Sequence, residues 1–306
     1  METQIAGVKL TNPVCNASGP RDTTFEELQY IAHTESSVIV MKSCTINPRE
    51  GNPEPRYKKT EYGSIQAMGL PNLGYHEYIK YAHILRAYDK PIMASVAGIN
   101  IEDYAIIVQS FQSNNDVDLI EINLSCPNAG KSIIGYDLAS MEEVLKQISK
   151  LGCIPIGLKL PAYYDDRYFE KVTDLVLKYN ISFISCINSI GNTLCIDIDT
   201  ESPVISPQEG FGGLSGHYIK PVAIANVRRF YRLLQGRVSI FGVGGVSSGK
   251  DVFEYILMGA DAVQIGTAFQ EEGEYAFQRI LFEFEFILKK KGYKTIADFK
   301  GNLKYQ

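Results

Sequence analysis

The sequence predicts one α/β domain over residues 1–306, a single (β/α)8 TIM barrel with a short N-terminal hairpin and long loops over its C-terminal face. Short apolar runs that end in small or polar residues recur eight times, and amphipathic segments separate them. No linker, low-complexity tract or other repeat divides the chain. Strands that alternate with helices in this way indicate a parallel sheet closed into a barrel.

The expected elements follow in order along the chain. The segment QIAGVKLTNP before the first strand indicates a small hairpin that plugs the bottom of the barrel. The strands are predicted at residues 14–19, 38–43, 91–98, 119–125, 155–161, 183–189, 238–245 and 262–268. Amphipathic helices between them include 23–34, 139–152, 166–180 and 249–260, with a last helix at 274–293.

Composition describes a soluble globular protein with a large core, since 45% of residues are hydrophobic and 21% are charged. A net charge of −5 argues against nucleic acid or an anionic membrane as the main partner. We find no signal peptide and no segment apolar for long enough to span a bilayer, so we expect a cytoplasmic protein. Six cysteines without a CxxC pair or Cys/His cluster argue for a reducing compartment and against bound metal.

The stretch LIEINLSCPN carries the strongest sign of chemistry. Polar and apolar residues alternate along it, as in a strand, and its polar face ends in Asn123 and Ser125. Cys126, Pro127 and Asn128 follow directly. The alternative for Cys126 is a small buried hydrophobe, the usual state of a free cysteine. Its place after a polar strand face, fixed by a proline, favours a functional role.

Polar and glycine residues gather where the predicted strands end, on the face where barrel enzymes build their sites. Lys42 and Lys159 each close an otherwise apolar strand, where an ammonium without a partner is costly. An anionic or electron-rich ligand would satisfy both, and salt bridges to core carboxylates are the alternative. The other strand-end residues are Ser18, Ser95, Asn123, Asn188, Gly244, Gly245, Gly266 and Thr267.

The motifs FGVGG and QIGTA follow the seventh and eighth strands, where barrels of this fold frequently bind phosphate. Glycines in a tight turn are the simpler explanation of either motif alone. A phosphate-bearing ligand over two lysines and a ring of amides indicates flavin mononucleotide (FMN). No GxGxxG fingerprint opens the chain, which argues against a Rossmann-type NAD site. Two insertions, residues 44–90 and 190–221, leave the same face and are expected to cover the site.

These motifs resemble those of class 1 dihydroorotate dehydrogenases, and most of all the soluble, fumarate-using class 1A. Pro71 favours class 1A over class 1B, which tends to have glutamine there, while class 2 enzymes use a serine base. The likeness covers nearly the whole chain and includes NASG (16–19), KSCT (42–45), REGNPEPRY (49–57), MGLPNLG (68–74), NLSCPN (123–128), GLKLP (157–161), NSIGN (188–192), GFGGLSG (210–216), IKP (219–221), GGV (244–246) and QIGTA (264–268).

The resemblance implies a role for each matching residue. Cys126 would be the general base that takes a proton from C5 of dihydroorotate, with Lys42 touching both flavin and substrate. The substrate residues would be Lys42, Gln66, Met68, Gly69, Leu70, Asn123, Asn128, Asn188 and Ser189. FMN would contact Ala17, Ser18, Lys42, Ser43, Ser95, Asn123, Lys159, Ile187, Gly216, Gly244, Gly245, Gly266 and Thr267.

Gln66 departs from the family pattern, which usually has asparagine at this position of the substrate loop. We expect its carboxamide to hydrogen-bond the substrate carboxylate. Glutamine has one more rotatable bond than asparagine, so forming this hydrogen bond costs it more side-chain entropy. Gln66→Asn is therefore expected to tighten orotate binding without changing FMN affinity.

The resemblance also implies the reaction and the partners. Dihydroorotate would be oxidised to orotate in pyrimidine (UMP) biosynthesis, fumarate would be reduced to succinate, and the protein would be a cytoplasmic homodimer with no membrane or nucleic-acid partner. Two alternatives stay open: another flavin-dependent dihydropyrimidine oxidoreductase with a cysteine base, or a non-catalytic FMN-binding barrel.

Overall fold

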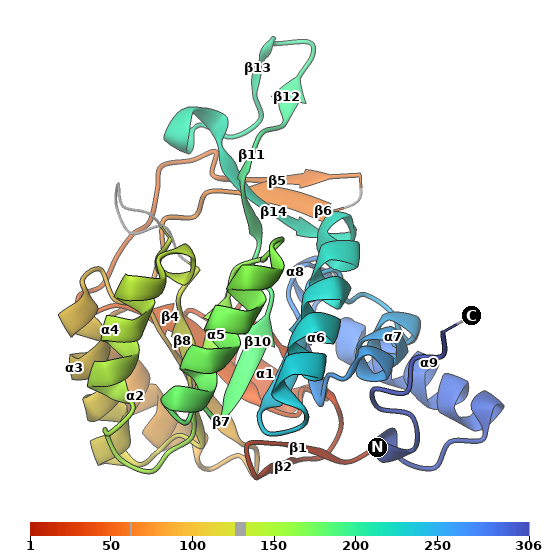
Figure 1. Ribbon diagram of the computed structural model, residues 1–306. Coiled ribbons are helices and arrows are strands. Elements are labelled where there is room, and N and C mark those ends of the chain that lie inside the picture. The colour runs from red at the N-terminus through yellow and green to blue at the C-terminus, as the bar shows by residue number, and fades with distance from the viewer. Residues whose placement is uncertain (62, 126–132, 306) are drawn as a thin grey trace.

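The computed structural model describes residues 1–61, 63–125 and 133–305. Its centre is a sheet of eight strands in the order β3-β16-β15-β10-β9-β8-β7-β4, with every pair parallel (Figure 1). These strands confirm the predicted set, and their bounds are β3 Val14–Asn16, β4 Ile39–Cys44, β7 Ile92–Val96, β8 Leu119–Asn123, β9 Ile156–Leu160, β10 Phe183–Cys186, β15 Ser239–Val243 and β16 Ala262–Ile265.

A side chain joins the two strands at the ends of this order. The carboxamide of Asn16 on β3 donates to the carbonyl oxygen of Val40 on β4 at 2.8 Å and accepts from its N–H at 3.0 Å. The asparagine therefore replaces a stretch of ladder between β3 and β4 and closes the sheet into a barrel.

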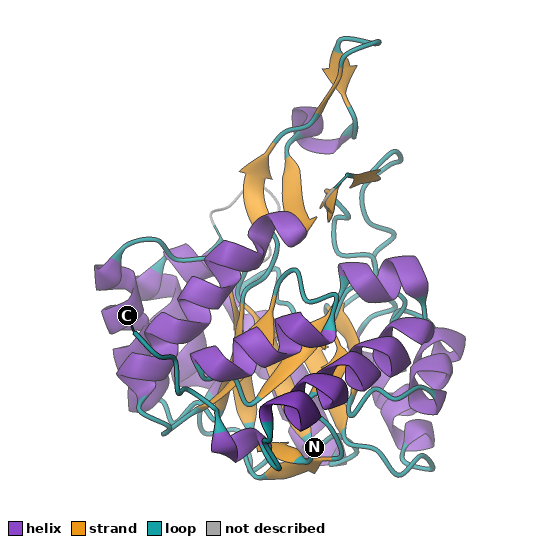
Figure 2. Ribbon diagram, turned by 90° about the vertical axis from the view of Figure 1, so that its right-hand side faces the viewer, coloured by secondary structure: helices purple, strands orange, loops and turns teal. Residues whose placement is uncertain are grey.

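Helices surround the barrel, as the view in Figure 2 shows. The predicted helices are confirmed as α1 Phe25–His33, α4 Leu138–Ile148, α5 Asp166–Lys178, α7 Gly249–Met258 and α9 Tyr275–Lys291. The helices α2 Tyr75–Leu85, α3 Ile101–Asn114, α6 Lys220–Leu234 and α8 Thr267–Glu272 complete the layer. Within the described ranges, no helix combines the length and apolar character needed to cross a membrane.

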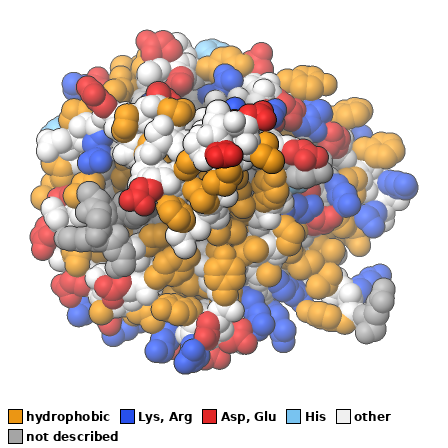
Figure 3. All heavy atoms as spheres, turned by 90° about the horizontal axis from the view of Figure 1, so that it is seen from above, with side chains coloured by type: hydrophobic (Ala, Val, Ile, Leu, Met, Phe, Trp, Pro, Cys, Tyr) orange, Lys and Arg blue, Asp and Glu red, His pale blue; other side chains and the backbone are white. Residues whose placement is uncertain are grey.

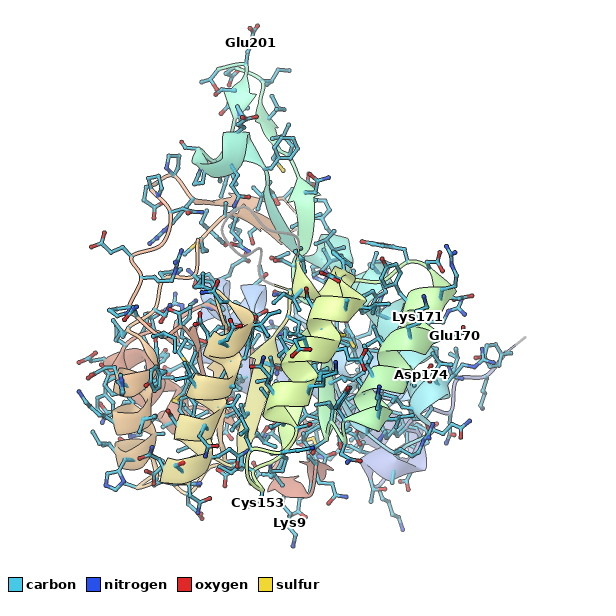
Figure 4. The ribbon with its side chains drawn as sticks, turned by 60° about the vertical axis from the view of Figure 1, so that its left-hand side comes forward. Lys9, Cys153, Glu170, Lys171, Asp174 and Glu201 are labelled. Atoms are coloured by element: carbon cyan, nitrogen blue, oxygen red, sulfur yellow. The ribbon has the colours of Figure 1, made fainter. Side chains whose placement is uncertain are left out.

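The predicted hairpin is also present, with β1 Thr3–Ile5 antiparallel to β2 Val8–Leu10. Its Ile5 and Leu10 are buried in the same cluster as Phe183 and Phe241, whose rings meet edge-on in the barrel interior. Lys9 lies at this lower end of the molecule (Figure 4). The hairpin thus plugs the end of the barrel opposite to the strand ends where polar residues gather.

A second sheet stands over the other end of the barrel. Its strands are β11 Ile190–Thr193, β14 Gly212–Gly216, β6 Gly63–Gln66 and β5 Tyr57–Thr60, in that order, so the two insertions meet in one antiparallel sheet. A short hairpin, β12 Ile196–Asp197 with β13 Ser202–Pro203, projects further, with Glu201 at its tip (Figure 4). Seen from above, apolar side chains gather over the middle of this face (Figure 3). We call the four-stranded sheet the roof sheet.

Candidate active site

A cavity of about 1140 Å³ opens at the carboxyl ends of the barrel strands and is covered by the roof sheet. Ser95 is buried behind it, with its hydroxyl 2.8 Å from that of Ser43. The cavity brings together these residues predicted for the site: Ala17, Ser18, Lys42, Ser43, Gln66, Met68, Gly69, Leu70, Asn123, Lys159, Ile187, Asn188, Ser189, Gly216, Gly244, Gly245, Gly266 and Thr267.

Cys126 and Asn128, which sequence motifs predict as site residues, lie outside the described residues. Ser125, the residue before Cys126, is buried just beyond β8 and lines the cavity. Three cysteines elsewhere, Cys15, Cys44 and Cys186, are fully buried, and burial raises the pKa of each thiol far above its ordinary value. These three are therefore held as thiols and offer no proton acceptor at neutral pH.

Lys42 enters the cavity from β4 with a carboxylate beside it. Its Nζ lies 3.7 Å from Asp22 Oδ1 and donates to the carbonyl oxygen of Gly19. The other oxygen of Asp22 accepts the N–H of Gly19 at 2.7 Å. Burial raises the pKa of Asp22 to about 6, although the nearby Lys42 ammonium acts in the opposite direction.

Lys159 belongs to a deeper polar network that links four strands. Its Nζ donates to Gln264 Oε1 at 2.7 Å and lies 3.9 Å from Glu121 Oε1. The other Glu121 oxygen accepts from Ser185 Oγ at 2.5 Å and from Gln264 Nε2 at 3.2 Å. All four residues are buried, so a layer of charge and hydrogen bonds crosses the barrel above the apolar plug.

Both lysines therefore have carboxylate neighbours, and the alternative of salt bridges to core carboxylates is confirmed for each. Both lysines still line the cavity. Asp22, Glu121 and Gln264 were not among the predicted site residues. Glu121 lies two residues before Asn123 on its strand, and Gln264 lies two residues after the buried Ala262 on its strand. Because alternate residues of a strand face the same side, this spacing was the signal that both side chains point into the barrel.

Two carboxamides and two hydroxyls form a chain across the strand ends. Asn188 Nδ2 donates to Ser125 Oγ at 2.7 Å, and Ser125 Oγ donates to Asn123 Oδ1 at 3.1 Å. Asn123 Nδ2 in turn donates to Ser43 Oγ at 3.2 Å. These bonds fix the amide planes before a ligand arrives, which suits recognition of a ring with alternating N–H and C=O groups.

The segment after β6 is held by an earlier part of the same insertion, through Asn52. Asn52 donates through its backbone N–H to the carbonyl oxygen of Met68 at 2.9 Å and through Nδ2 to that of Ala67 at 2.8 Å. Gly69 has φ +75°, and a Cβ there would approach Asn52 to 2.5 Å. Asn52 thus shapes the loop from Met68 to Leu70. A further bond within this segment runs from the Met68 N–H to Gln66 Oε1 at 3.0 Å.

Glycines line the part of the cavity that lies just beyond the carboxyl ends of β15 and β16. Gly244 and Gly245 have φ +123° and +68°, values that side chains rarely adopt, and a Cβ on Gly245 would approach the Gly216 carbonyl oxygen to 2.8 Å. At Gly266 the nearest atom to an added Cβ would be Ala17 Cβ at 3.7 Å. A side chain at Gly244 or Gly245 would therefore be both strained and crowded, whereas Gly266 has space for one, and the backbone of all three glycines lines the cavity.

The fold and this site define a (β/α)8-barrel protein with a polar, partly glycine-lined cavity at the carboxyl ends of its strands. Comparison with known proteins gives the family of the chain. The family model described as Dihydroorotate dehydrogenase matches residues 1–288. The chain is 42% identical to dihydroorotate dehydrogenase A (fumarate) of Lactococcus lactis subsp. lactis (strain IL1403), over 99% of both chains.

Other relatives give the same result. Dihydroorotate dehydrogenase (fumarate) of Trypanosoma cruzi (strain CL Brener) is 44% identical over 96% of this chain and 95% of its own. The crystal structure of DHODH in complex with ferulenol from Eimeria tenella has a TM-score of 0.80 over 98% of this chain and 87% of that one, at 18% identity, which supports the fold. The chain belongs to the dihydroorotate dehydrogenase family, and its resemblance to class 1A is confirmed.

Proposed function

We propose that this protein is an FMN-dependent dihydroorotate dehydrogenase that oxidises dihydroorotate to orotate and reduces fumarate, in the biosynthesis of UMP. The observation that carries the proposal is the cavity, which joins two buried ammonium groups, a chain of carboxamides and a glycine-lined end. Relatives that are 42% and 44% identical over nearly their whole length are named for this reaction and this acceptor.

The residues present fit FMN. Gly244, Gly245 and Gly266 line the cavity with backbone that carries no side chain, so their N–H groups could bind a phosphate, and Thr267 adds a hydroxyl. Lys159, Lys42 and the hydroxyls of Ser18 and Ser43 would hold the ring system, with an ammonium available to compensate negative charge. A cavity of about 1140 Å³ exceeds the usual range for one small ligand, which leaves space for a pyrimidine beside the flavin.

The chemistry of this chain's residues then follows. Bound FMN would supply the acceptor for the hydride that leaves C6 of dihydroorotate. Cys126 takes the proton from C5, so that the two losses leave the C5–C6 double bond of orotate. The Asn123 and Asn188 carboxamides bind the ring edges together with Asn128. Lys42 compensates the charge of the ligands while Asp22 keeps it in place.

The proposal also covers the oligomeric state of the protein and its place in the cell. The arm formed by β12 and β13 exposes apolar side chains, with Ile198 86% exposed, and such a surface suits a second copy in a homodimer. We infer a cytoplasmic homodimer without a membrane or nucleic-acid partner. Sedimentation that gives only monomer at micromolar concentration would contradict the homodimer, and a membrane-bound fraction in lysed cells would contradict the location.

Anaerobic mixing of the FMN-loaded protein with dihydroorotate tests the proposal. We expect the flavin absorbance to bleach and to return when fumarate is added. Cys126→Ser should retain FMN and bleach at least about a hundredfold more slowly at pH 7, because loss of a general base costs roughly 10²–10⁴ in rate. Its rate should recover in part as the pH rises. Cys153→Ser is the matched control, since Cys153 is exposed at the opposite end of the barrel (Figure 4).

Other outcomes would select the alternatives. Bleaching by dihydrouracil in preference to dihydroorotate would indicate a different dihydropyrimidine oxidoreductase. Bound flavin that no dihydropyrimidine bleaches would indicate a non-catalytic FMN-binding barrel. Equal rates for Cys126→Ser and the wild type at pH 7 would remove Cys126 from the mechanism.

A further inference from the structure

Gln66 uses both ends of its carboxamide inside the protein. Its Oε1 accepts the N–H of Met68 at 3.0 Å, and its Nε2 donates to Ser189 Oγ at 3.3 Å. We propose that Gln66 is a positioning residue, which fixes the Ser189 hydroxyl as a hydrogen-bond donor to an acceptor oxygen of the bound pyrimidine. This inference rests on the proposed function and gives Gln66 a role through Ser189 in place of direct contact with the substrate.

The direction of these bonds is set by chemistry. A backbone N–H can only donate, so the carboxamide atom that faces Met68 must be the oxygen. The nitrogen then faces Ser189, and it too can only donate. Ser189 Oγ therefore accepts from Gln66, and its own proton is free to point elsewhere.

The hydroxyl proton of Ser189 is available to a ligand. Ser189 lines the cavity, and among the residues that the structure describes its Oγ donates to no protein acceptor. Its backbone is fixed separately, because the Ser189 N–H donates to Asn188 Oδ1 at 2.9 Å. Because Gln66 Nε2 binds a lone pair of Ser189 Oγ, the orientation of this hydroxyl is fixed before the ligand binds, and it is a preorganised donor. Carboxylate and carbonyl oxygens are the acceptors that match it.

Gly213 on the roof sheet makes room for this contact. It pairs with Gln66 in the register between β14 and β6. A Cβ on Gly213 would lie 2.5 Å from Ser189 Oγ and 3.0 Å from Gln66 Nε2. The bond between Gln66 and Ser189 therefore joins the roof sheet to the segment after β10, across 123 positions of the chain.

A thermodynamic cycle on the FMN-loaded protein tests the inference. Gln66→Met keeps the length of the side chain and removes both hydrogen bonds, and Ser189→Ala removes the donor. We expect each change to weaken orotate binding by about tenfold, as befits loss of one hydrogen bond to a charged group. In the double variant we expect no loss beyond that of Ser189→Ala. KM for dihydroorotate should rise more than kcat falls, and FMN affinity should stay unchanged.

Gln66→Glu supplies a check on the direction of the bond. A carboxylate cannot donate, so it would accept the Ser189 proton and turn the hydroxyl away from the ligand. Orotate binding by this variant should be weaker than that by Gln66→Met.

Gln112→Met is the matched control. The carboxamide of Gln112 also holds a backbone segment, with bonds of 2.9 Å to the N–H and to the carbonyl oxygen of Ile154, away from the cavity. This change should lower stability and leave the orotate dissociation constant unchanged.

Losses that multiply in the double variant would show that Gln66 contacts orotate itself and would overturn the inference, as would unchanged binding by Gln66→Met. Tighter binding by Gln66→Asn would also contradict it, because asparagine is too short to hold both partners. A wild-type protein that binds FMN but neither dihydroorotate nor orotate would instead refute the proposed function.

Discussion

At the scale of the residue, Asp22 lets a lysine remain buried next to a ligand cavity. It is fully buried, and only one of its oxygens has a hydrogen-bond partner in the described part of the chain. A carboxylate and an ammonium so close to each other offset the cost of removing either from water, but only in part. The stability of the protein should therefore depend on the protonation of this group.

Asp22→Asn should change how stability varies with pH. Burial raises the pKa of Asp22 in the folded protein from its ordinary value of 3.8 to about 6. A raised carboxyl pKa gives stabilisation that is complete below the unfolded-state pKa and is lost as pH rises through about 6. At about 1.4 kcal/mol per pKa unit, the change is about 3 kcal/mol. The measurement is the free energy of unfolding in urea from pH 4 to pH 7.

Over that range the wild type should lose stability relative to Asp22→Asn. Parallel curves for the two proteins would contradict the assignment. Asp165→Asn is the control, because hydrogen bonds from Arg167 lower the pKa of the half-buried Asp165 to about 2, below the range measured. Its curve should run parallel to that of the wild type.

The sequence could predict which residues reach the cavity but not what neutralises them. Lys42 and Lys159 stand at strand ends, a position visible in the alternation of each strand. Their carboxylate partners come from the segment before α1 for Asp22 and from the neighbouring strand for Glu121. The stagger between barrel strands decides which inward-facing residues of two strands become neighbours. This stagger cannot be read from the local sequence of either strand.

At the scale of the element, the roof sheet depends on the close approach of two glycine-containing strands. Gly63 on β6 pairs with Gly216 on β14, and a Cβ on Gly63 would collide with the carbonyl oxygen of Ser215. Gly63→Ala should therefore force the two strands apart. We expect a loss of about 1–3 kcal/mol in unfolding free energy, typical of overpacking.

Because β6 leads into the segment from Gln66 to Leu70, Gly63→Ala should also weaken orotate binding in a flavin absorbance titration. Gly191→Ala on β11 is the control for stability, since the nearest atom to its added Cβ would be 4.0 Å away. Equal unfolding free energies for the two variants would show that the approach of β6 to β14 does not limit the sheet.

The two insertions were expected to cover the site, and the structure confirms that they do. Their pairing into one sheet could not be predicted, because their strands are only four or five residues long and rich in glycine. Such strands carry little of the alternation that sets register, and tertiary contacts decide it.

At the scale of the whole molecule, the barrel could be predicted because β/α alternation is a local pattern with one common outcome. The cavity of about 1140 Å³ at the strand ends is large enough to be the site of both reactants in turn. If fumarate enters where orotate has left, the reaction proceeds in two halves, and the kinetics should be ping-pong.

Steady-state rates at varied dihydroorotate and fumarate should therefore give parallel double-reciprocal lines. Orotate should compete with fumarate, because both would use the same amides and Lys42. Intersecting lines, or a fumarate rate that orotate does not reduce, would require separate sites. Rapid reoxidation of the isolated protein by NAD with fumarate inert would contradict the proposed acceptor.

The roof sheet is assembled from segments that are distant in the chain, whereas the barrel grows by neighbouring β/α units. Closing long loops costs more entropy, so distant pairings form later in folding. In pulse-labelled amide exchange, we expect β8 and β9 to gain protection before β6 and β14. In a newly synthesised chain the cavity would then stay uncovered until the roof sheet forms, and we expect the cofactor to bind during that time.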